Sequence, residues 1–155
     1  MTQIAIGSPL PPFRLTGHDG STVDNDVIRG KAVLFSFHPL AWTGVCLRQM
    51  EALEMNAERF ADLGAVAYGA SVDSVPCKKA WADSMGLEKT LLLSDFWPHG
   101  AFASSVGLFR EADGISERAV IIADPTGVIR FAKVLPIGEV PDLEEQIEEL
   151  KKITS

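Results

Sequence analysis

The chain has 155 residues, of which 46% are hydrophobic and 23% are charged, a usage typical of a globular protein rather than a disordered one. Its 14 basic and 21 acidic residues give a formal net charge of −7, which argues against a nucleic-acid or anionic-membrane surface. No apolar run approaches the ~20 residues of a membrane span, and the first residues lack the basic and apolar regions of a secretory leader. We therefore expect one domain, residues 1–155, in the cytoplasm.

The first half of the chain predicts a hairpin, a buried strand and a helix. Asp19-Gly20 lies between short alternating runs and indicates the hairpin turn. The apolar run over 32–37 is typical of a buried central strand. From 46 to 60, apolar residues spaced by four and three positions share one helical face, with Thr43 as a candidate N-cap and Gly64 as the expected stop.

The second half continues the alternation of strands and helices. The expected elements are a strand over 65–71, a helix over 77–85, a short strand over 90–93, a helix over 98–106, strands over 119–122 and 128–131 joined by a turn, and a last helix from Pro141. A parallel crossover followed by an antiparallel hairpin predicts a thioredoxin-like α/β fold, in which helices flank both faces of a mixed central sheet.

Cys46 is the residue on which the functional prediction depends. It lies near the start of a predicted helix, where free backbone N–H groups and the helix dipole favour a thiolate. The structural alternative is strong, because a lone cysteine on an apolar helical face is usually a small buried hydrophobe. Position alone therefore does not make Cys46 a nucleophile.

The residues around Cys46 change this balance. Pro39, Thr43 and Cys46 form a Pro-x-x-x-Thr-x-x-Cys sequence that resembles the peroxidatic motif of the peroxiredoxin family. The resemblance extends over most of the chain, through Ser-Val-Asp-Ser at 71–74, Ala80-Trp81 and Ser-Glu-Arg-Ala-Val-Ile-Ile at 116–122. The segments Pro-Leu-Ala-Trp-Thr-Gly at 39–44 and Leu-Ser-Asp-Phe-Trp-Pro-His-Gly at 93–100 are most similar to the alkyl hydroperoxide reductase E group.

The resemblance implies a thiol peroxidase that reduces hydrogen peroxide and small organic hydroperoxides without metal, haem or flavin. Cys46 would be the nucleophile, Thr43 and Arg118 would position and polarise the peroxide, and Pro39 would shield the thiol. Each has a plainer role as well: Thr43 as a helix cap, Arg118 as a solvated strand charge, and Pro39 as a strand end. Gln49 stands where many peroxiredoxins have glutamate; its amide oxygen can still accept from Arg118 but brings no charge.

Two routes remain open for recycling the oxidised Cys46. The alkyl hydroperoxide reductase E group typically has one working cysteine and uses an external thiol, whereas some peroxiredoxins resolve with a cysteine in the helix where Cys77 is predicted. Cys77 is therefore a candidate resolving thiol, with Lys78 and Lys79 favouring its thiolate, or an inert core residue. The resemblance also implies a thioredoxin-like or other thiol reductant, and a homodimer with Phe96, Trp97, Pro98 and His99 near its interface.

Other functions are weighed against the peroxidase. The same cysteine chemistry would serve a peroxide sensor or redox-controlled interaction protein. A thiol–disulfide oxidoreductase lacks its Cys-x-x-Cys sequence here. A metal site from His38, Cys46, Cys77 and His99 lacks paired ligand spacing, and a Cys46–His38 hydrolase dyad lacks a third orienting residue. A sulfur sealed among apolar side chains, or an Arg118 turned to solvent, would contradict the peroxidase.

Overall fold

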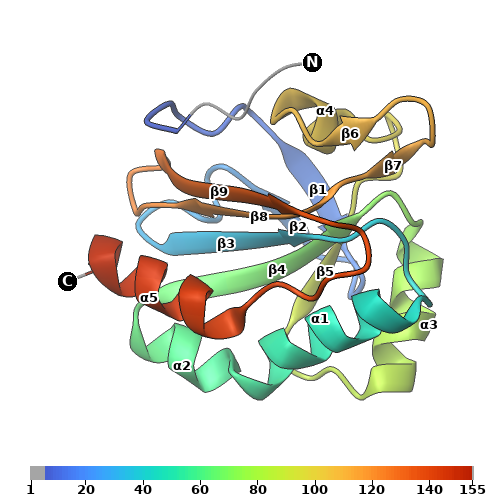
Figure 1. Cartoon of the computed structure of the whole chain (residues 1–155), viewed down its shortest axis with the longest axis horizontal. Coiled ribbons are helices and arrows are strands. Elements are labelled where there is room, and N and C mark those ends of the chain that lie inside the picture. Colours follow the sequence, from blue (N-terminus) through green and yellow to red (C-terminus); the bar gives the residue numbers. More distant parts are fainter. Residues whose placement is uncertain (1–5, 155) are drawn as a thin grey trace.

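A computed structural model describes residues 6–154, which form a seven-stranded mixed sheet and five helices (Figure 1). The sheet order is β2-β1-β5-β4-β3-β8-β9, and a separate pair, β6 and β7, forms a second small sheet. The elements are β1 Arg14–Gly17, β2 Thr22–Asp24, β3 Ala32–Phe37, α1 Gly44–Met55, α2 Ala57–Asp62, β4 Ala65–Ser71, α3 Val75–Met85, β5 Leu91–Ser94, α4 Ala101–Ser105, β6 Phe109–Arg110, β7 Ile115–Ser116, β8 Arg118–Ala123, β9 Ile129–Leu135 and α5 Leu143–Thr154.

The centre of the sheet is buried on both faces. Strands β3, β4 and β5 run parallel, and β8 pairs antiparallel with β3. Every residue of β3 and of β8 is buried, which explains why both sequences are apolar without alternation. The hairpin of β1 and β2, which the Asp19-Gly20 turn predicts, pairs antiparallel with β5 at one side of the sheet.

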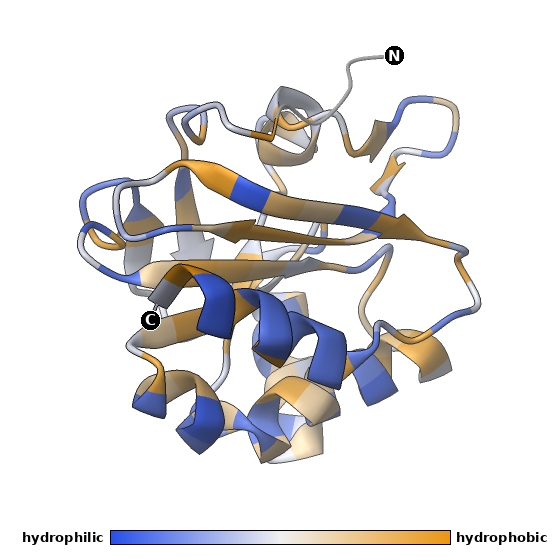
Figure 2. Ribbon diagram, turned by 60° about the vertical axis from the view of Figure 1, so that its left-hand side comes forward, coloured by the Kyte–Doolittle hydropathy of each residue, from blue (hydrophilic) through white to orange (hydrophobic). Residues whose placement is uncertain are grey.

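The two faces of the sheet are covered unequally. Helices α1, α2, α3 and α5 pack on one face, and the short α4 lies on the other (Figure 1). The second face is completed by apolar side chains from the segment before β1 and from the residues after α4, including Leu10, Phe13 and Leu108. Figure 2 shows the strands of the sheet largely orange and the outward side of α5 blue, as expected for an amphipathic helix over a buried sheet. The mixed α/β architecture predicted from the sequence is confirmed.

Two local predictions were wrong, and one pair of strands was not predicted. The helix expected to run to Gly64 is two helices, α1 and α2, separated at Asn56, whose side-chain amide donates to the carbonyl of Ala52. Asparagine favours such helix ends because its side chain competes for backbone hydrogen bonds. Helix α4 begins later than expected, after Gly100 in the left-handed region at φ 69°. The β6–β7 pair was not predicted, because two-residue strands carry no periodic signal.

The Met50 side chain of α1 reaches β4 at Gly69. A Cβ atom added there would collide with Met50 Sδ and a Leu92 methyl group. Met50 lies one helical turn after Cys46 on the buried side of α1. The missing side chain at Gly69 therefore leaves room for the Met50 side chain. Within residues 6–154, no helix is long and apolar enough to cross a membrane.

Candidate active site

Cys46 lies in the first turn of α1, directly after the loop over 38–43 that leaves β3. Its exposure is 0%, and it packs in the apolar cluster between the sheet and the helices. Trp42, four residues before it, adopts φ 68°, an uncommon backbone conformation for a residue other than glycine, and its side chain is exposed. The chain thus turns sharply just before the helix that carries the thiol.

Arg118 is brought to Cys46 by the pairing of β8 with β3. Phe37, the last residue of β3, pairs with Ala119, so Arg118 lies just beyond the end of β3 where the loop to α1 begins. Its Nη1 lies 3.3 Å from Cys46 Sγ. Its Nε donates to the carbonyl of Ile137 at 2.7 Å, and the residue is almost fully buried. The guanidinium faces the sulfur rather than solvent, so Cys46, although 0% exposed, is not sealed among apolar side chains alone.

Gln49 completes the surroundings of the guanidinium. Its Oε1 accepts from Arg118 Nη1 at 2.6 Å. Its Nε2 donates to Ser36 Oγ at 2.6 Å and to the carbonyl of Phe37 at 3.0 Å. The amide therefore forms hydrogen bonds through both of its polar atoms: its oxygen binds Arg118, and its nitrogen binds the end of β3. The sequence identified Gln49 as a partner for Arg118, but gave no sign of Ile137, which acts through its backbone.

Pro39 and Thr43 flank the site in different ways. Pro39 is buried in the loop before α1. Thr43 is exposed and occupies the N-cap position of α1, but its hydroxyl makes no capping hydrogen bond. Instead Thr43 Oγ1 donates to the carbonyl of Leu40 at 3.0 Å. The predicted cap by the Thr43 side chain is therefore wrong, because the Thr43 hydroxyl is engaged in a hydrogen bond to the loop carbonyl instead.

A buried polar network lies beside this loop. Lys78 is fully buried, and its Nζ donates to Ser71 Oγ and lies 3.1 Å from His38 Nε2. Burial, together with the Lys78 charge, lowers the pKa of His38 well below 6.5. Burial also lowers the pKa of Lys78 to about 7. His38 points to Lys78 and to the carbonyl of Ser36, so its ring nitrogens are engaged away from Cys46.

Cys77 lies in the first turn of α3, and both cysteines are free thiols. Its backbone N–H donates to Ser74 Oγ at 3.3 Å, and its sulfur lies 3.9 Å from Asp73 Oδ1. It is half-buried and packs against the same apolar cluster that holds Cys46. Of the two lysines expected to favour its thiolate, Lys79 is turned away to Asp83 at 3.1 Å.

The aromatic segment after β5 is on the surface. Trp97 is 82% exposed and Phe96 is also exposed. His99 Nε2 lies 2.7 Å from the carbonyl of Gly114, and its ring meets Phe96 and Phe109 edge to face. Asp95, just before this segment, accepts the first free N–H groups of α4.

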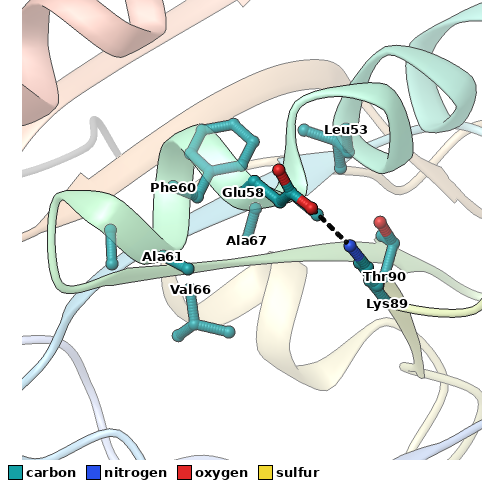
Figure 3. A pocket seen from close by; sticks show the side chains of 10 residues that line it. Leu53, Glu58, Phe60, Ala61, Val66, Ala67, Lys89 and Thr90 are labelled. Carbon is teal, nitrogen blue, oxygen red and sulfur yellow. Dashed lines mark hydrogen bonds and ion pairs between the residues drawn. The ribbon is translucent and has the colours of Figure 1, made fainter.

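A surface hollow lies elsewhere, between α2, β4 and the residues before β5 (Figure 3). Leu53, Phe60 and Ala67 form its apolar wall, and Glu58 pairs with Lys89 at 3.1 Å across it. Cys46 and Arg118 do not line it. The hollow is therefore separate from the group around the thiol.

The chain is similar to known proteins over nearly its whole length. The model of the AhpC/TSA family matches residues 6–132. Alkyl hydroperoxide reductase E of Mycobacterium tuberculosis is 36% identical over 151 residues, covering 97% of this chain and 98% of the relative. Peroxiredoxin-1 of Gallus gallus is 34% identical and covers 88% of this chain and 74% of its own length. The crystal structure of Enterococcus faecalis AhpC superposes with a TM-score of 0.90 at 27% identity, over 97% of this chain and 92% of that one.

Proposed function

The chain belongs to the AhpC/TSA family and is a thiol-dependent peroxidase of thioredoxin-like fold, and we propose that Cys46 is its peroxide-reducing nucleophile. The observation that carries this proposal is the 3.3 Å contact between Arg118 Nη1 and Cys46 Sγ at the start of α1. A guanidinium and a helix N-terminus both favour the thiolate, which is the reactive form of a cysteine.

The reaction transfers one oxygen atom to sulfur. The Cys46 thiolate attacks the terminal oxygen of a hydroperoxide, the S–O bond forms as the O–O bond breaks, and the sulfur becomes a sulfenic acid. The departing oxygen leaves with both electrons of the broken bond and takes a proton from solvent, giving water or an alcohol. Arg118 Nη1 and the free backbone N–H of Cys46 are the donors that would stabilise the negative charge on that oxygen.

Access to the sulfur requires movement. Because Cys46 is 0% exposed, a peroxide reaches it only when neighbouring side chains shift. The loop over 38–43 is the segment we assign to this role, since Pro39 and Ala41 are buried while Leu40, Trp42 and Thr43 are exposed. Pro39 would then shield the thiol between turnovers, and Thr43 would leave the carbonyl of Leu40 to meet the substrate.

Recycling needs a second thiol, and Cys77 is our candidate. Cys77 packs against the apolar cluster that holds Cys46. It lies in the first turn of α3, and the end of a helix is where local unwinding is least costly. Its attack on the sulfenic acid would form a Cys46–Cys77 disulfide and release water. An external thiol or a thioredoxin-like protein would then reduce the disulfide.

A cytoplasmic homodimer is part of the same proposal. Leu40, Trp42, Phe96, Trp97 and Ile137 are large apolar side chains left exposed. Aromatic residues of this kind are enriched at protein interfaces. Sedimentation of the purified chain over a range of concentrations tests the dimer, and a monomer throughout would reject it.

Replacement of Cys46 tests the nucleophile. Cys46→Ser is expected to abolish peroxide consumption while the far-ultraviolet circular dichroism stays that of the wild type. The matched control is Cys77→Ser, which is expected to keep the first oxidation by one equivalent of peroxide. Peroxide turnover by folded Cys46→Ser would reject the proposal. A wild-type protein that reacts once and stalls with every reductant would be a sensor instead.

A further inference from the structure

A buried cation without a role in the reaction described above lies beside the active-site loop. Among residues 6–154, the fully or almost fully buried Lys and Arg side chains are Lys78 and Arg118. Arg118 faces the thiol, but Lys78 does not touch it by any hydrogen bond in the described part of the chain. Burying an ammonium group is costly unless its donors are satisfied, so the contacts of Lys78 indicate its role.

Lys78 is linked to the loop over 38–43 at two points. First, its Nζ lies 3.1 Å from Nε2 of His38, the residue with which the loop begins. Second, Nζ donates to Ser71 Oγ, which donates to Asp73 Oδ2 at 2.5 Å. The same carboxylate oxygen accepts the backbone N–H of Ala41 at 2.8 Å. The two links hold the loop on either side of Pro39, one at His38 and the other at Ala41.

We propose that Lys78 is a positioning residue for the peroxidase reaction: through His38 on one side and Ser71 and Asp73 on the other, it holds the loop that leads into Cys46. This inference rests on the proposed role of Cys46 as nucleophile. Lys78 does not meet the substrate. It fixes the loop that carries Pro39 and sets the start of α1, and it adds positive charge to the interior near the thiol.

The charge on Lys78 changes near neutral pH. Burial lowers its pKa to about 7, and neighbouring negative groups oppose that effect. The titratable and charged groups that face the network come from several elements: Cys46 in α1, Asp73 after β4, Cys77 in α3, Asp95 after β5, His38 after β3 and Arg118 in β8. An ammonium at Lys78 and a thiolate at Cys46 stabilise each other, and this coupling is reciprocal.

The test is the pH dependence of the first oxidation. Lys78→Met keeps a side chain of similar length but removes its charge and its donors. The second-order rate constant for oxidation by hydrogen peroxide is followed by tryptophan fluorescence, since Trp81 packs against His38. We expect the midpoint of the pH–rate profile to rise by about one pH unit, which makes the variant about tenfold slower on the acid side.

Lys79→Met is the matched control. It removes a lysine from the same helix, but Lys79 is exposed and paired with Asp83, so its profile should match that of the wild type. A Lys78→Met protein with lower thermal stability, an unchanged midpoint and an unchanged rate constant above that midpoint would show a merely structural lysine and overturn the inference.

A second measurement applies if Lys78→Met does not fold. The titration of the Lys78 side chain is followed by nuclear magnetic resonance in the reduced wild type and in Cys46→Ser. Loss of the thiolate should lower the midpoint of Lys78, and equal midpoints would overturn the inference. If the wild type consumes no peroxide, the proposed function fails, whereas the comparison of Lys78 midpoints still reports whether the two residues are coupled.

Discussion

Gln49 and Arg118 share a 2.6 Å hydrogen bond, in which the amide oxygen accepts from the same Nη1 that lies 3.3 Å from the Cys46 sulfur. The amide orients the guanidinium without adding a negative charge beside the thiol. Because its nitrogen donates to Ser36 and Phe37, Gln49 also ties the guanidinium to the end of β3. A carboxylate at this position could not make those two donations.

Gln49→Glu is therefore expected to destabilise this protein. The new carboxylate would lose the donation to Phe37 and would bring one of its own oxygens, an acceptor, against that carbonyl oxygen. An unpaired buried polar group costs about 1–3 kcal/mol. Urea unfolding at neutral pH measures the free energy of unfolding, and a variant as stable as the wild type would contradict this account of Gln49.

Arg118→Lys is expected to retain the positive charge but to lower the rate of the reaction with peroxide. One guanidinium contacts Cys46, Gln49 and the carbonyl of Ile137 at once, and a lysine cannot reproduce this planar arrangement. Loss of one such donor typically costs about 2.7–4 kcal/mol of transition-state stabilisation, or about 10²–10³ in rate. Stopped-flow oxidation by hydrogen peroxide measures it. Arg48→Lys, on the exposed side of α1, is the control, and equal rates for the two variants would exclude this role for Arg118.

The sequence predicted the helices and strands that have a clear local pattern and the site residues that belong to a recognisable motif. The apolar run of β3 and the four-and-three spacing of α1 are local signals, so these elements lie where they were expected. Arg118 and Cys46 are 72 residues apart, and their contact was anticipated from the motif resemblance. Resemblance and pattern together therefore predicted most of the fold and the residues nearest the thiol.

Some contacts of the site could not be predicted from the sequence. Lys78 shares the buried face of α3 with Trp81 and Ala82, although a lysine is normally solvated, and it turns inward to His38, 40 residues away. The carbonyl of Ile137 holds Arg118 through the backbone, which the sequence cannot signal. Thr43 occupies the expected position, but a nearby carbonyl competes for its hydroxyl.

Cys77 is testable by intact mass after one equivalent of peroxide. If Cys77 resolves the sulfenic acid, the wild type loses two hydrogen atoms as the disulfide forms, and Cys77→Ser gains one oxygen atom instead. Cys77 would then leave its half-buried position near Asp73, and we expect the first turn of α3 to unwind as it does. A wild type that retains the added oxygen would assign Cys77 to structure.

His38 predicts a loss of stability on mild acidification. Burial, followed by the charge of Lys78, lowers the pKa of His38 well below 6.5. As the pH falls below 6.5, the unfolded chain takes up a proton that the folded chain does not, so the free energy of unfolding decreases by up to about 1.4 kcal/mol per pH unit.

His38→Gln should flatten this slope in urea unfolding at a series of pH values, whereas His99→Gln, at an exposed position, should not. His18, whose pKa burial also lowers, remains in both variants and contributes equally to each. Equal slopes in the two variants would show that His38 does not control acid sensitivity.

The packing of Met50 against Gly69 has a consequence for the core beside the thiol. Because position 69 presents only a hydrogen atom to Met50, the thioether lies directly over the backbone of β4. Alanine at Gly69 would displace the Met50 side chain, which lies one helical turn after Cys46. The smallest residue of β4 thus determines how the side chain next to the nucleophile packs.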